Sequence, residues 1–491
     1  MAVTTGESST TLPTTQAPPA REIERRSIDW VPEDERHGRL WHQMPLWFLG
    51  NFQYFSIPIG FIGPALGLSL VWTIVAGALG ILVGTLFMAF HATQGPRLGL
   101  PQMIQSRAQF GYRGVLVPLF ATLFTYMAFN VADQVLLSSG LNAAFGWSVG
   151  LVAIVSAILA AVIAIWGHDW VHRAFRLILM FSLPVVTILT LGVIFGAADG
   201  HAPKAHLGFV FAGFMAQFSA AAAYNITYAP YVSDYSRYLP KDTPSRKVIA
   251  SVFAGAAASP IWLISLGAWL AIRLGATDGL LGTKLAGNNI FHPLGTVAAF
   301  LLALGLAATM GMNAYGGMLS FLTGVDSIKS IRPGRRARVV TIVLLTVIWY
   351  VIAETISSNA VSTVLNSLTL MLYLLVPWTA TNLVDFFLVR HGRYAIADLF
   401  TPNGLYGAWG WRGLTAYGLG FLAEIPFMVL PGIAGFKYTG PVAKNISGID
   451  ISWIVGLLVS GTAYWLFSRS LNVDAEAGAI KASDEALEAT I

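Results

Sequence analysis

The chain has 491 residues, of which 55% are hydrophobic and only 11% are charged. A soluble domain carries about 25% charged residues, so this composition excludes an ordinary soluble protein and indicates a chain embedded in a membrane. The net charge of +5 does not indicate nucleic-acid binding, because loop topology sets it. A chain without cysteine forms no disulfide and no thiolate metal site.

Twelve apolar segments divide the sequence, each about long enough to cross ~30 Å of hydrocarbon as a helix. In chain order they are residues 45–69, 71–93, 115–141, 148–167, 175–197, 207–230, 247–272, 293–323, 338–356, 361–389, 414–434 and 451–468. The pattern predicts an all-α integral membrane protein with twelve transmembrane helices. Residues 95–112 are too short and too polar to span, so we expect an interfacial or re-entrant segment there.

The basic residues orient the predicted bundle. Only five of the 29 Lys and Arg residues fall in gaps that are outside when the N-terminus is inside, namely Lys204, Arg273, Lys284, Lys437 and Lys444. Cytoplasmic loops carry an excess of Lys and Arg. We therefore predict a multi-pass protein of the cell membrane with both termini in the cytoplasm.

The first predicted span is rich in residues that disrupt a helix. It reads PLWFLGNFQYFSIPIGFIGPALGLSL, with prolines and glycines inside it. Pro removes a backbone donor and Gly weakens a helix. Backbone groups freed at membrane depth need protein or a water-filled cavity to satisfy them. One interpretation is a kinked helix packed through small residues; the other is a discontinuous helix that lines a substrate and ion site.

The sixth predicted span is interrupted in a similar way. It reads QFSAAAAYNITYAPYVSDYSRYLP, and its apolar run stops at Tyr224, Asn225, Thr227, Tyr228 and Pro230. Spans one and six occupy matching positions in two five-helix halves. Interrupted helices at matching positions are typical of inverted-repeat transporters, in which they form the binding site.

These observations divide the chain into four expected parts. They are residues 1–40 as a disordered cytoplasmic arm, 41–390 as a ten-helix inverted-repeat transport core, 391–469 as two additional helices, and 470–491 as a disordered cytoplasmic tail. The arm lacks the apolar run of a signal peptide. The sequence has no nucleotide-binding loop and no zinc motif, so we do not expect ATP-driven transport by this chain alone.

The third predicted span carries a row of polar side chains. Tyr126, Asn130 and Asp133 are spaced i, i+4 and i+7, which places them on one face of a helix. A charged carboxylate at this depth costs roughly 2.5 kcal/mol or more, so Asp133 must be paired, hydrated or protonated. The row is either a structural hydrogen bond to a neighbouring helix or a substrate contact at Asn130 beside an aromatic platform. In the second case, Asp133 is a candidate for proton or cation coupling.

The eighth predicted span reads LGLAATMGMNAYGGMLSFLTG, with Thr309 and Asn313 as i, i+4 neighbours. A hydroxyl near unwound carbonyls suits Na⁺, a hard cation that prefers oxygen ligands. An asparagine amide suits a heterocycle with alternating donors and acceptors. The alternative is polar helix packing through faces of small residues.

Other acids near or inside the spans are weaker candidates. Glu354 and Asp385 lie near span ends, where solvation is the simpler expectation. Glu424 lies inside span eleven, where we expect a structural pair. Asp234 and Arg237 in DYSRYLP either form an ion pair that steadies an inner gate or form a solvated pair worth ~0–1 kcal/mol.

Five segments between about residues 40 and 465 carry a resemblance when they are taken in order. They read WFLGNFQYFSIPIGFIGPALGLS, GPRLGLPQMIQSRAQFG, YAPYVSDYSRYLP, MNAYGGMLS and LVPWTATNLVDFFLVRHGRY. Together they resemble the purine–cytosine permeases of the nucleobase–cation symporter-1 family. The resemblance implies a leucine-transporter-like fold of two inverted five-helix repeats plus two extra helices. It also implies symport of a nucleobase or related heterocycle with Na⁺ or H⁺.

The resemblance also assigns roles to residues. With the arguments above, it gives as substrate-binding Gly50, Asn51, Gln53, Tyr126, Asn130, Tyr224, Asn225, Thr227, Tyr228 and Asn313. Thr309 and Asp133 are the candidates for cation coupling, with a possible Na⁺ at Thr309 and at backbone carbonyls near Gly50. Beyond this ion we expect no cofactor, and beyond substrate and bilayer no obligatory partner.

One position departs from the family pattern. Cytosine and purine carriers of the fungal type have an acidic residue early in the fifth helix, where this sequence places Phe175 in GHDWVHRAFRLILM. This leaves uracil, allantoin, hydantoin, a purine or a vitamin-like ring open as the substrate.

The competing predictions are a transporter of the same fold for amino acids, amines or vitamins, and a membrane-embedded enzyme. The enzyme is disfavoured because most of the nine histidines lie in tails and loops. A channel or a non-transporting sensor is compatible with the same pattern.

Overall fold

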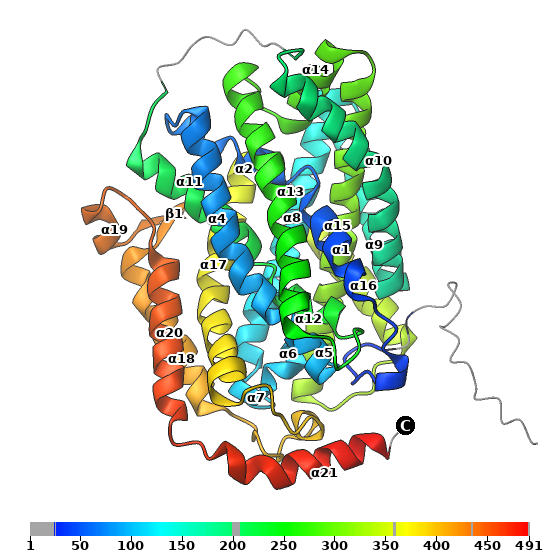
Figure 1. The fold of residues 1–491 in the computed structure, drawn as a ribbon, viewed down its shortest axis with the longest axis vertical. Helices are drawn as coiled ribbons and strands as arrows, with labels where there is room; N and C mark the ends of the chain where they lie inside the picture. The colour runs from blue at the N-terminus through cyan, green and yellow to red at the C-terminus, as the bar shows by residue number, and fades with distance from the viewer. Residues whose placement is uncertain (1–23, 25, 199–206, 357–359, 434–435, 490–491) are drawn as a thin grey trace, which may run out of the picture.

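The computed structural model describes residue 24 and residues 26–198, 207–356, 360–433 and 436–489 (Figure 1). Long helices run side by side along the molecule: α4 (Leu70–His91), α8 (Leu116–Phe145), α9 (Val149–Trp166), α10 (His168–Ile194), α13 (Ser245–Arg273), α15 (Leu294–Ile328), α16 (Arg335–Thr355) and α17 (Ala360–Val384). Among the described residues, eight helices are long and apolar enough to cross a membrane, or nine if one bent pair is a single span.

Shorter elements complete the bundle. The helices are α1 (Gln43–Asn51), α2 (Ser56–Ile59), α3 (Ile62–Ala65), α5 (Gln94–Leu98), α6 (Gln102–Gln105), α7 (Arg107–Phe110), α11 (Phe211–Ile226), α12 (Ala229–Ser236), α14 (Gly279–Ile290), α18 (Trp411–Glu424), α19 (Pro441–Asn445), α20 (Ser452–Ser468) and α21 (Ala477–Glu488). A π-helix (Asp385–Val389) follows α17 directly. The strands β1 (Val429–Ile433) and β2 (Phe436–Thr439) pair antiparallel.

Helices occupy all twelve stretches predicted from hydropathy, but two of those stretches are interrupted as expected. The first contains α1, α2 and α3, and the sixth contains α11 and α12. Residues 94–110 form three short helices, α5 to α7, whose residues are buried except Arg97. This segment is therefore packed against the bundle and does not span it, and whether it is interfacial or re-entrant stays a prediction.

Three expectations are wrong in part. The predicted span 414–434 ends as a helix at Glu424, and Pro426 and Pro431 explain why β1 follows, since proline cannot continue an α-helix. The tail 470–491 contains α21 rather than disorder. In the arm 1–40, residues 24 and 26–40 pack against the bundle, and Ser27, Ile28 and Val31 are buried. The rest of the arm lies outside the described residues.

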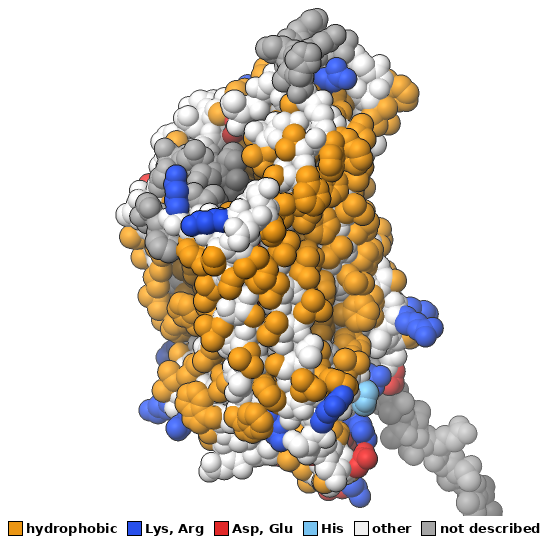
Figure 2. All heavy atoms as spheres, turned by 90° about the vertical axis from the view of Figure 1, so that its left-hand side faces the viewer, with side chains coloured by type: hydrophobic (Ala, Val, Ile, Leu, Met, Phe, Trp, Pro, Cys, Tyr) orange, Lys and Arg blue, Asp and Glu red, His pale blue; other side chains and the backbone are white. Residues whose placement is uncertain are grey.

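Large apolar side chains cover the outside of the bundle. Figure 2 shows the face that includes α18 and α20, where hydrophobic side chains form a broad band and Lys and Arg gather mostly below it. Leu422 and Leu458 are 62% and 64% exposed on that face. Water would disfavour so much exposed apolar surface, whereas lipid accepts it. The protein is therefore a membrane protein.

Small residues let the central helices approach closely. A Cβ on Gly80 of α4 would lie 2.2 Å from the carbonyl oxygen of Phe218 in α11, and one on Gly267 of α13 would lie 2.0 Å from that of Ile57 in α2. Close backbone approach through small residues is typical of helix packing in membranes. It holds the two interrupted segments against α4 and α13.

Candidate functional site

The interrupted segments α1–α2 and α11–α12 face each other in the centre of the bundle. Four of the five residues from Phe52 to Ser56 lie outside a helix, and α15 packs against them, since Tyr54 N donates to Leu302 O at 3.3 Å. Freed groups at the first break have local partners. Asn51 O accepts from Ser56 Oγ at 2.6 Å, and Gly50 O accepts from Tyr228 Oη at 3.4 Å. The break is thus a stable, fully buried structure.

Two of the predicted substrate amides bond to each other across the breaks. Asn51 Nδ2 donates to Asn225 Oδ1 at 2.9 Å and to Ala256 O at 3.0 Å. Asn225 Nδ2 donates in turn to Thr85 Oγ1 at 2.6 Å and to Ala256 O at 2.9 Å. This pair joins α1, α11, α4 and α13 through its N–H donors, and it leaves Asn51 Oδ1 buried without a partner among the described residues. Its geometry fits a structural lock better than substrate binding.

A second polar cluster joins α8 to α15. Asn313 Nδ2 donates to Asn130 Oδ1 and to Asp133 Oδ2, both at 2.9 Å. All three side chains are about 1% exposed. Asn313 Oδ1 is buried and accepts no hydrogen bond from the described residues. The structure therefore brings together the three polar residues that the third and eighth spans predicted, and one acceptor remains available.

Aromatic rings surround this cluster. Tyr228 stacks on Phe129 with ring centroids 5.5 Å apart, and Phe55 stacks on Tyr224 at 5.3 Å. Tyr126 packs against Tyr231 at 4.3 Å. These rings offer flat apolar surfaces for a planar ligand. In this conformation, they contact each other and fill the centre of the bundle.

The remaining predicted residues have local roles. Gln53 Nε2 donates to Tyr224 Oη at 3.1 Å, and Thr227 Oγ1 donates to Tyr224 O at 2.9 Å. Thr309 Oγ1 donates to Gly305 O within its own helix at 3.1 Å. A Cβ on Gly305 would lie 3.0 Å from the Cβ of Gln53, so Thr309 lies one turn from the point where α15 meets the first break.

Phe175 lies at the first break. It is fully buried on α10, and its ring would touch a Cβ on Gly50 at 4.0 Å. Fungal-type carriers were expected to have an acidic residue at this position. In this chain, the Phe175 side chain forms an apolar surface beside the break. No carboxylate is present there to pair with a protonated or amino-bearing ring.

Sequence reasoning missed four rings of this site: Trp47, Phe55, Phe129 and Tyr231. Trp47 packs edge-on against Tyr228 at 6.3 Å, and Phe55 lies 5.7 Å from Phe129. Aromatic residues in an apolar helix look the same whether they face lipid, core or ligand. The only available signal for Phe129 was its place between Tyr126 and Asn130 on the same helix.

Asp234 and Arg237 are neither solvated nor paired with each other. Both are buried; Asp234 accepts from Gln102 N at 2.9 Å and from Tyr126 Oη at 3.3 Å. Arg237 donates to Ser27 O at 2.7 Å. The expectation of a direct or solvated pair is therefore wrong, because the N-terminal segment and α6 supply the partners.

Glu24 is the centre of this end of the bundle. Its carboxylate accepts from Arg237 at 3.2 Å, Arg338 at 3.0 Å and Tyr315 at 3.0 Å, and it also bonds to Tyr238. Burial raises the pKa of Glu24, but the two guanidiniums outweigh burial and hold that pKa at about 2. We call Glu24 and these four partners the N-terminal clasp. It ties α12, α15 and α16 to the N-terminal segment.

The other acids differ from expectation in two cases. Glu354 is exposed at the end of α16, as predicted. Asp385 is fully buried and accepts from Gln109, Tyr394 and Tyr464, so solvation is the wrong explanation for it. Glu424 is buried and has no hydrogen-bond partner among the described residues, so the expected structural pair is absent there.

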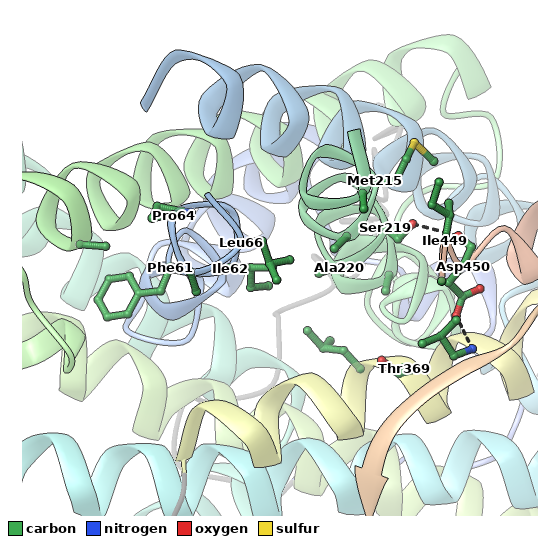
Figure 3. Close-up of a pocket in the computed structure, with 18 of the residues that line it drawn as sticks. Phe61, Ile62, Pro64, Leu66, Met215, Ser219, Ala220, Thr369, Ile449 and Asp450 are labelled. Atoms are coloured by element: carbon green, nitrogen blue, oxygen red, sulfur yellow. Dashed lines mark hydrogen bonds between the residues drawn. The ribbon is translucent and has the colours of Figure 1, made fainter. Parts of the chain in front are cut away.

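An apolar cavity of about 850 Å³ lies beside the site rather than at it. Figure 3 shows Phe61 to Leu66 of the α3 region on one side, Met215 and Ser219 of α11 on another, and Thr369 of α17 below. None of the predicted binding residues lines it. The side chains of the predicted site are buried, whereas this cavity adjoins the α3 end of the first interrupted segment.

Comparison with known proteins bears on the function. A family model described as a permease for cytosine/purines, uracil, thiamine and allantoin matches residues 30–456. The putative purine-cytosine permease YxlA of Bacillus subtilis (strain 168) is 36% identical over 91% of this chain and 96% of its own length. The purine-cytosine permease fcyB of Emericella nidulans is 23% identical over 90% and 87%.

The fold is also similar to solved structures. Mhp1, a nucleobase-cation-symport-1 family transporter solved in a closed conformation with bromovinylhydantoin bound, has a TM-score of 0.70 at 15% identity and covers 94% of this chain and 98% of that one. A sodium-coupled sialic acid symporter has a TM-score of 0.59 at 14% identity, covering 90% and 92%.

Proposed function

Because this chain belongs to the family of permeases for cytosine/purines, uracil, thiamine and allantoin, we propose that it imports a nucleobase or related heterocycle together with a cation. Family membership makes it a membrane transporter and not an enzyme. The mechanism that we propose is secondary active transport by alternating access. Twelve transmembrane helices, arranged as two inverted five-helix repeats and two extra helices with both ends in the cytoplasm, are part of this proposal.

The α8–α15 cluster is the observation that carries the proposed site. Asn130, Asn313 and Asp133 present amide and carboxyl groups beside the stacked rings of Phe129 and Tyr228. A flat heterocycle needs both: rings to stack on, and paired donors and acceptors for its edge. Leaving one such group unpaired costs about 1–3 kcal/mol. Discrimination between substrates should therefore depend on Asn130 and Asn313, with Tyr126 and Tyr224 as further walls.

The buried site implies how substrate enters. The Phe129–Tyr228 contact occupies the space between the rings, so a ligand must separate them, and the interrupted helices are the elements free to move. Asn51 and Asn225 would hold the breaks together while this happens. A cation coupled to the same change would favour substrate binding, because two ligands that select one conformation assist each other.

The direct test is ligand-induced thermal stabilisation of the purified protein. The panel contains nucleobases, allantoin, hydantoins and vitamins, together with amino acids and amines as the competing classes, each with Na⁺ and with K⁺ in its place. A ligand at 100 times its dissociation constant stabilises the folded state by about 2.7 kcal/mol, so a true substrate stands out. Stabilisation by amino acids or amines alone would refute the heterocycle assignment.

The coupling ion is decided by two variants. If Na⁺ is coupled, Thr309→Ala should weaken the Na⁺ dependence of uptake while Asp133→Asn leaves it in place. If uptake follows the proton gradient and ignores Na⁺, Asp133→Asn should abolish that dependence, because an amide cannot carry the proton. Uptake that keeps its cation dependence in both variants would show that neither residue is the coupling group.

A further inference from the structure

A histidine–carboxylate cluster lies outside the proposed transport site, where the N-terminal segment meets the start of α10. His37 Nε2 lies 3.2 Å from Asp169 Oδ1, and His168 Nδ1 lies 3.0 Å from the same oxygen. One ligand atom from each of the three residues falls within 4.8 Å of the others. The two histidines are 131 positions apart in the sequence, so the fold itself assembles the cluster.

Backbone carbonyls orient both imidazole rings. His37 Nδ1 donates to Glu35 O at 2.8 Å, and His168 Nε2 donates to Tyr235 O at 3.3 Å, because a carbonyl oxygen can only accept. In a neutral imidazole, the other nitrogen then carries a lone pair. A carboxylate oxygen can likewise only accept, so His37 Nε2 and His168 Nδ1 donate to Asp169 Oδ1 when the rings are protonated. A metal ion would take the place of these two protons, and the two nitrogens and the carboxylate oxygen would then share it.

This arrangement is typical of a metal site. A histidine that binds a metal usually donates its other N–H to a carbonyl or carboxylate, which fixes the tautomer and the ring direction. Ligand atoms held about 2.0–2.1 Å from a Zn²⁺ ion in a tetrahedron lie roughly 3.3 Å from each other, close to the two contacts with Asp169. Two nitrogens and one carboxylate oxygen are ligands that Zn²⁺ accepts, and the chain has no cysteine to compete.

Access to the cluster suits an exchangeable ion. The His168 side chain is 7% exposed, whereas those of His37 and Asp169 are 34% and 45% exposed. One side is thus anchored in the protein and the other is open to water, which can supply the fourth ligand. The backbone N–H of His168 also donates to Glu24 at 3.0 Å, so the cluster adjoins the N-terminal clasp.

We propose that His37, His168 and Asp169 bind one divalent transition-metal ion of the Zn²⁺ class, with water completing the coordination. The bound ion links the N-terminal segment to α10 beside the clasp and so holds this segment against the bundle. The proposal stands on the cluster alone and does not depend on which substrate is transported.

The test is Zn²⁺ titration of the full-length purified protein, without a histidine tag, against a chromophoric chelator. We expect one Zn²⁺ per chain for the wild type. His37→Gln and Asp169→Asn should each weaken binding by at least about tenfold, because changes to groups that merely orient ligands already cost 10–100-fold. The control His391→Asn removes an exposed histidine elsewhere and should bind as the wild type does.

A second measurement guards against misfolding. The His37 side chain is 34% exposed, so His37→Gln should keep close to the wild-type melting temperature without metal. Added Zn²⁺ should raise that temperature for the wild type and the control, but not for His37→Gln. Equal affinity in His37→Gln and wild type, or no wild-type binding up to about 100 μM Zn²⁺, would overturn the proposal.

Discussion

At the scale of single residues, the buried asparagines differ in what surrounds them. The side-chain N–H groups of Asn51 and Asn225 donate across helices to each other, to Thr85 and to Ala256 O. Asn51 Oδ1 and Asn313 Oδ1 each accept no hydrogen bond from the described residues, so a free acceptor does not distinguish the two pairs. Asn130 and Asn313 differ in that they bond to Asp133 or to each other beside the stacked rings of Phe129 and Tyr228. We therefore centre the proposed substrate contacts on Asn130 and Asn313.

Replacement of Asn130 tests this distinction. Asn130→Ala should weaken substrate binding by about 10–100-fold, because loss of one amide leaves a polar group of the ligand unpaired at a cost of about 1–3 kcal/mol. Binding is measured by substrate-dependent thermal stabilisation or radiolabelled ligand. The matched control is Asn142→Ala, which changes an exposed asparagine of the same helix. Unchanged affinity in Asn130→Ala would contradict the assignment.

Polar residues of the site were predictable and aromatic ones were not. Asn130, Asp133 and Asn313 stand out because a polar group in an apolar helix needs a physical reason. Phe129 and Trp47 have no such cost, so nothing in the sequence separates them from lipid-facing or core rings. The partners of Asp234 and Arg237 could not be predicted either, since they come from residues 78 or more positions away.

At the scale of elements, backbone contact fixes α2 against α13. A Cβ on Gly267 would meet Ile57 O at 2.0 Å, and the rigid backbone cannot move aside cheaply. Gly267→Ala should therefore destabilise the protein by about 1–3 kcal/mol, as overpacking does, and lower its melting temperature in detergent. Gly418→Ala, in open space on α18, is the control and should not lower it. Equal stability of the two variants would show that α2 can shift.

The N-terminal clasp makes a second prediction at this scale. In Glu24→Gln, Arg237 and Arg338 lose the carboxylate that neutralises them, so the N-terminal segment should detach more often. The chain has no cysteine, so a single Ser27→Cys substitution provides one thiol that reports detachment of the segment. Ser27 is 1% exposed in the attached segment, so labelling of this cysteine by a thiol reagent should be faster when Glu24→Gln is also present. The control Glu33→Gln breaks an exposed pair with Lys241 and should leave labelling slow.

The pKa of Glu24 predicts how this clasp depends on pH. That pKa is lowered in the folded protein to about 2, so the clasp contributes its full stability above the ordinary value near 4.5 and loses it as the pH falls towards 2. The labelling rate of Ser27→Cys relative to that of the exposed Lys241→Cys at the same pH, which cancels the ionisation of the thiol itself, should therefore stay constant between pH 6 and 8. A rise of this ratio within that range, in a protein that retains Glu24, would assign the change to another group.

At the scale of the whole molecule, hydropathy located the helices because lipid forces backbone hydrogen bonds to be satisfied locally. Hydropathy did not predict the structure of the segments that lipid does not constrain. The β1–β2 hairpin follows where Pro426 prevents α18 from continuing. The tail is anchored by the ion pair of Arg390 with Glu476, which directly precedes α21, and by the hydrogen bond from Ala397 N to Ser483 Oγ of α21. The tail looked disordered by composition because its partners lie in the loop after α17.

Charge distribution along the chain makes a prediction about the molecule as a whole, namely which end faces the cytoplasm. Lys444 lies in α19, which Figure 1 shows above α18 and α20 and which the charge pattern predicts to be outside, and Lys241 pairs with Glu33 of the N-terminal segment; both side chains are exposed. In the cysteine-free chain, Lys444→Cys should react with a membrane-impermeant thiol reagent on intact cells. Lys241→Cys should react only after permeabilisation. The reverse pattern would show that the protein has the opposite orientation in the membrane. Reaction of both residues on intact cells would place both of them outside and would contradict the odd number of spans predicted between them.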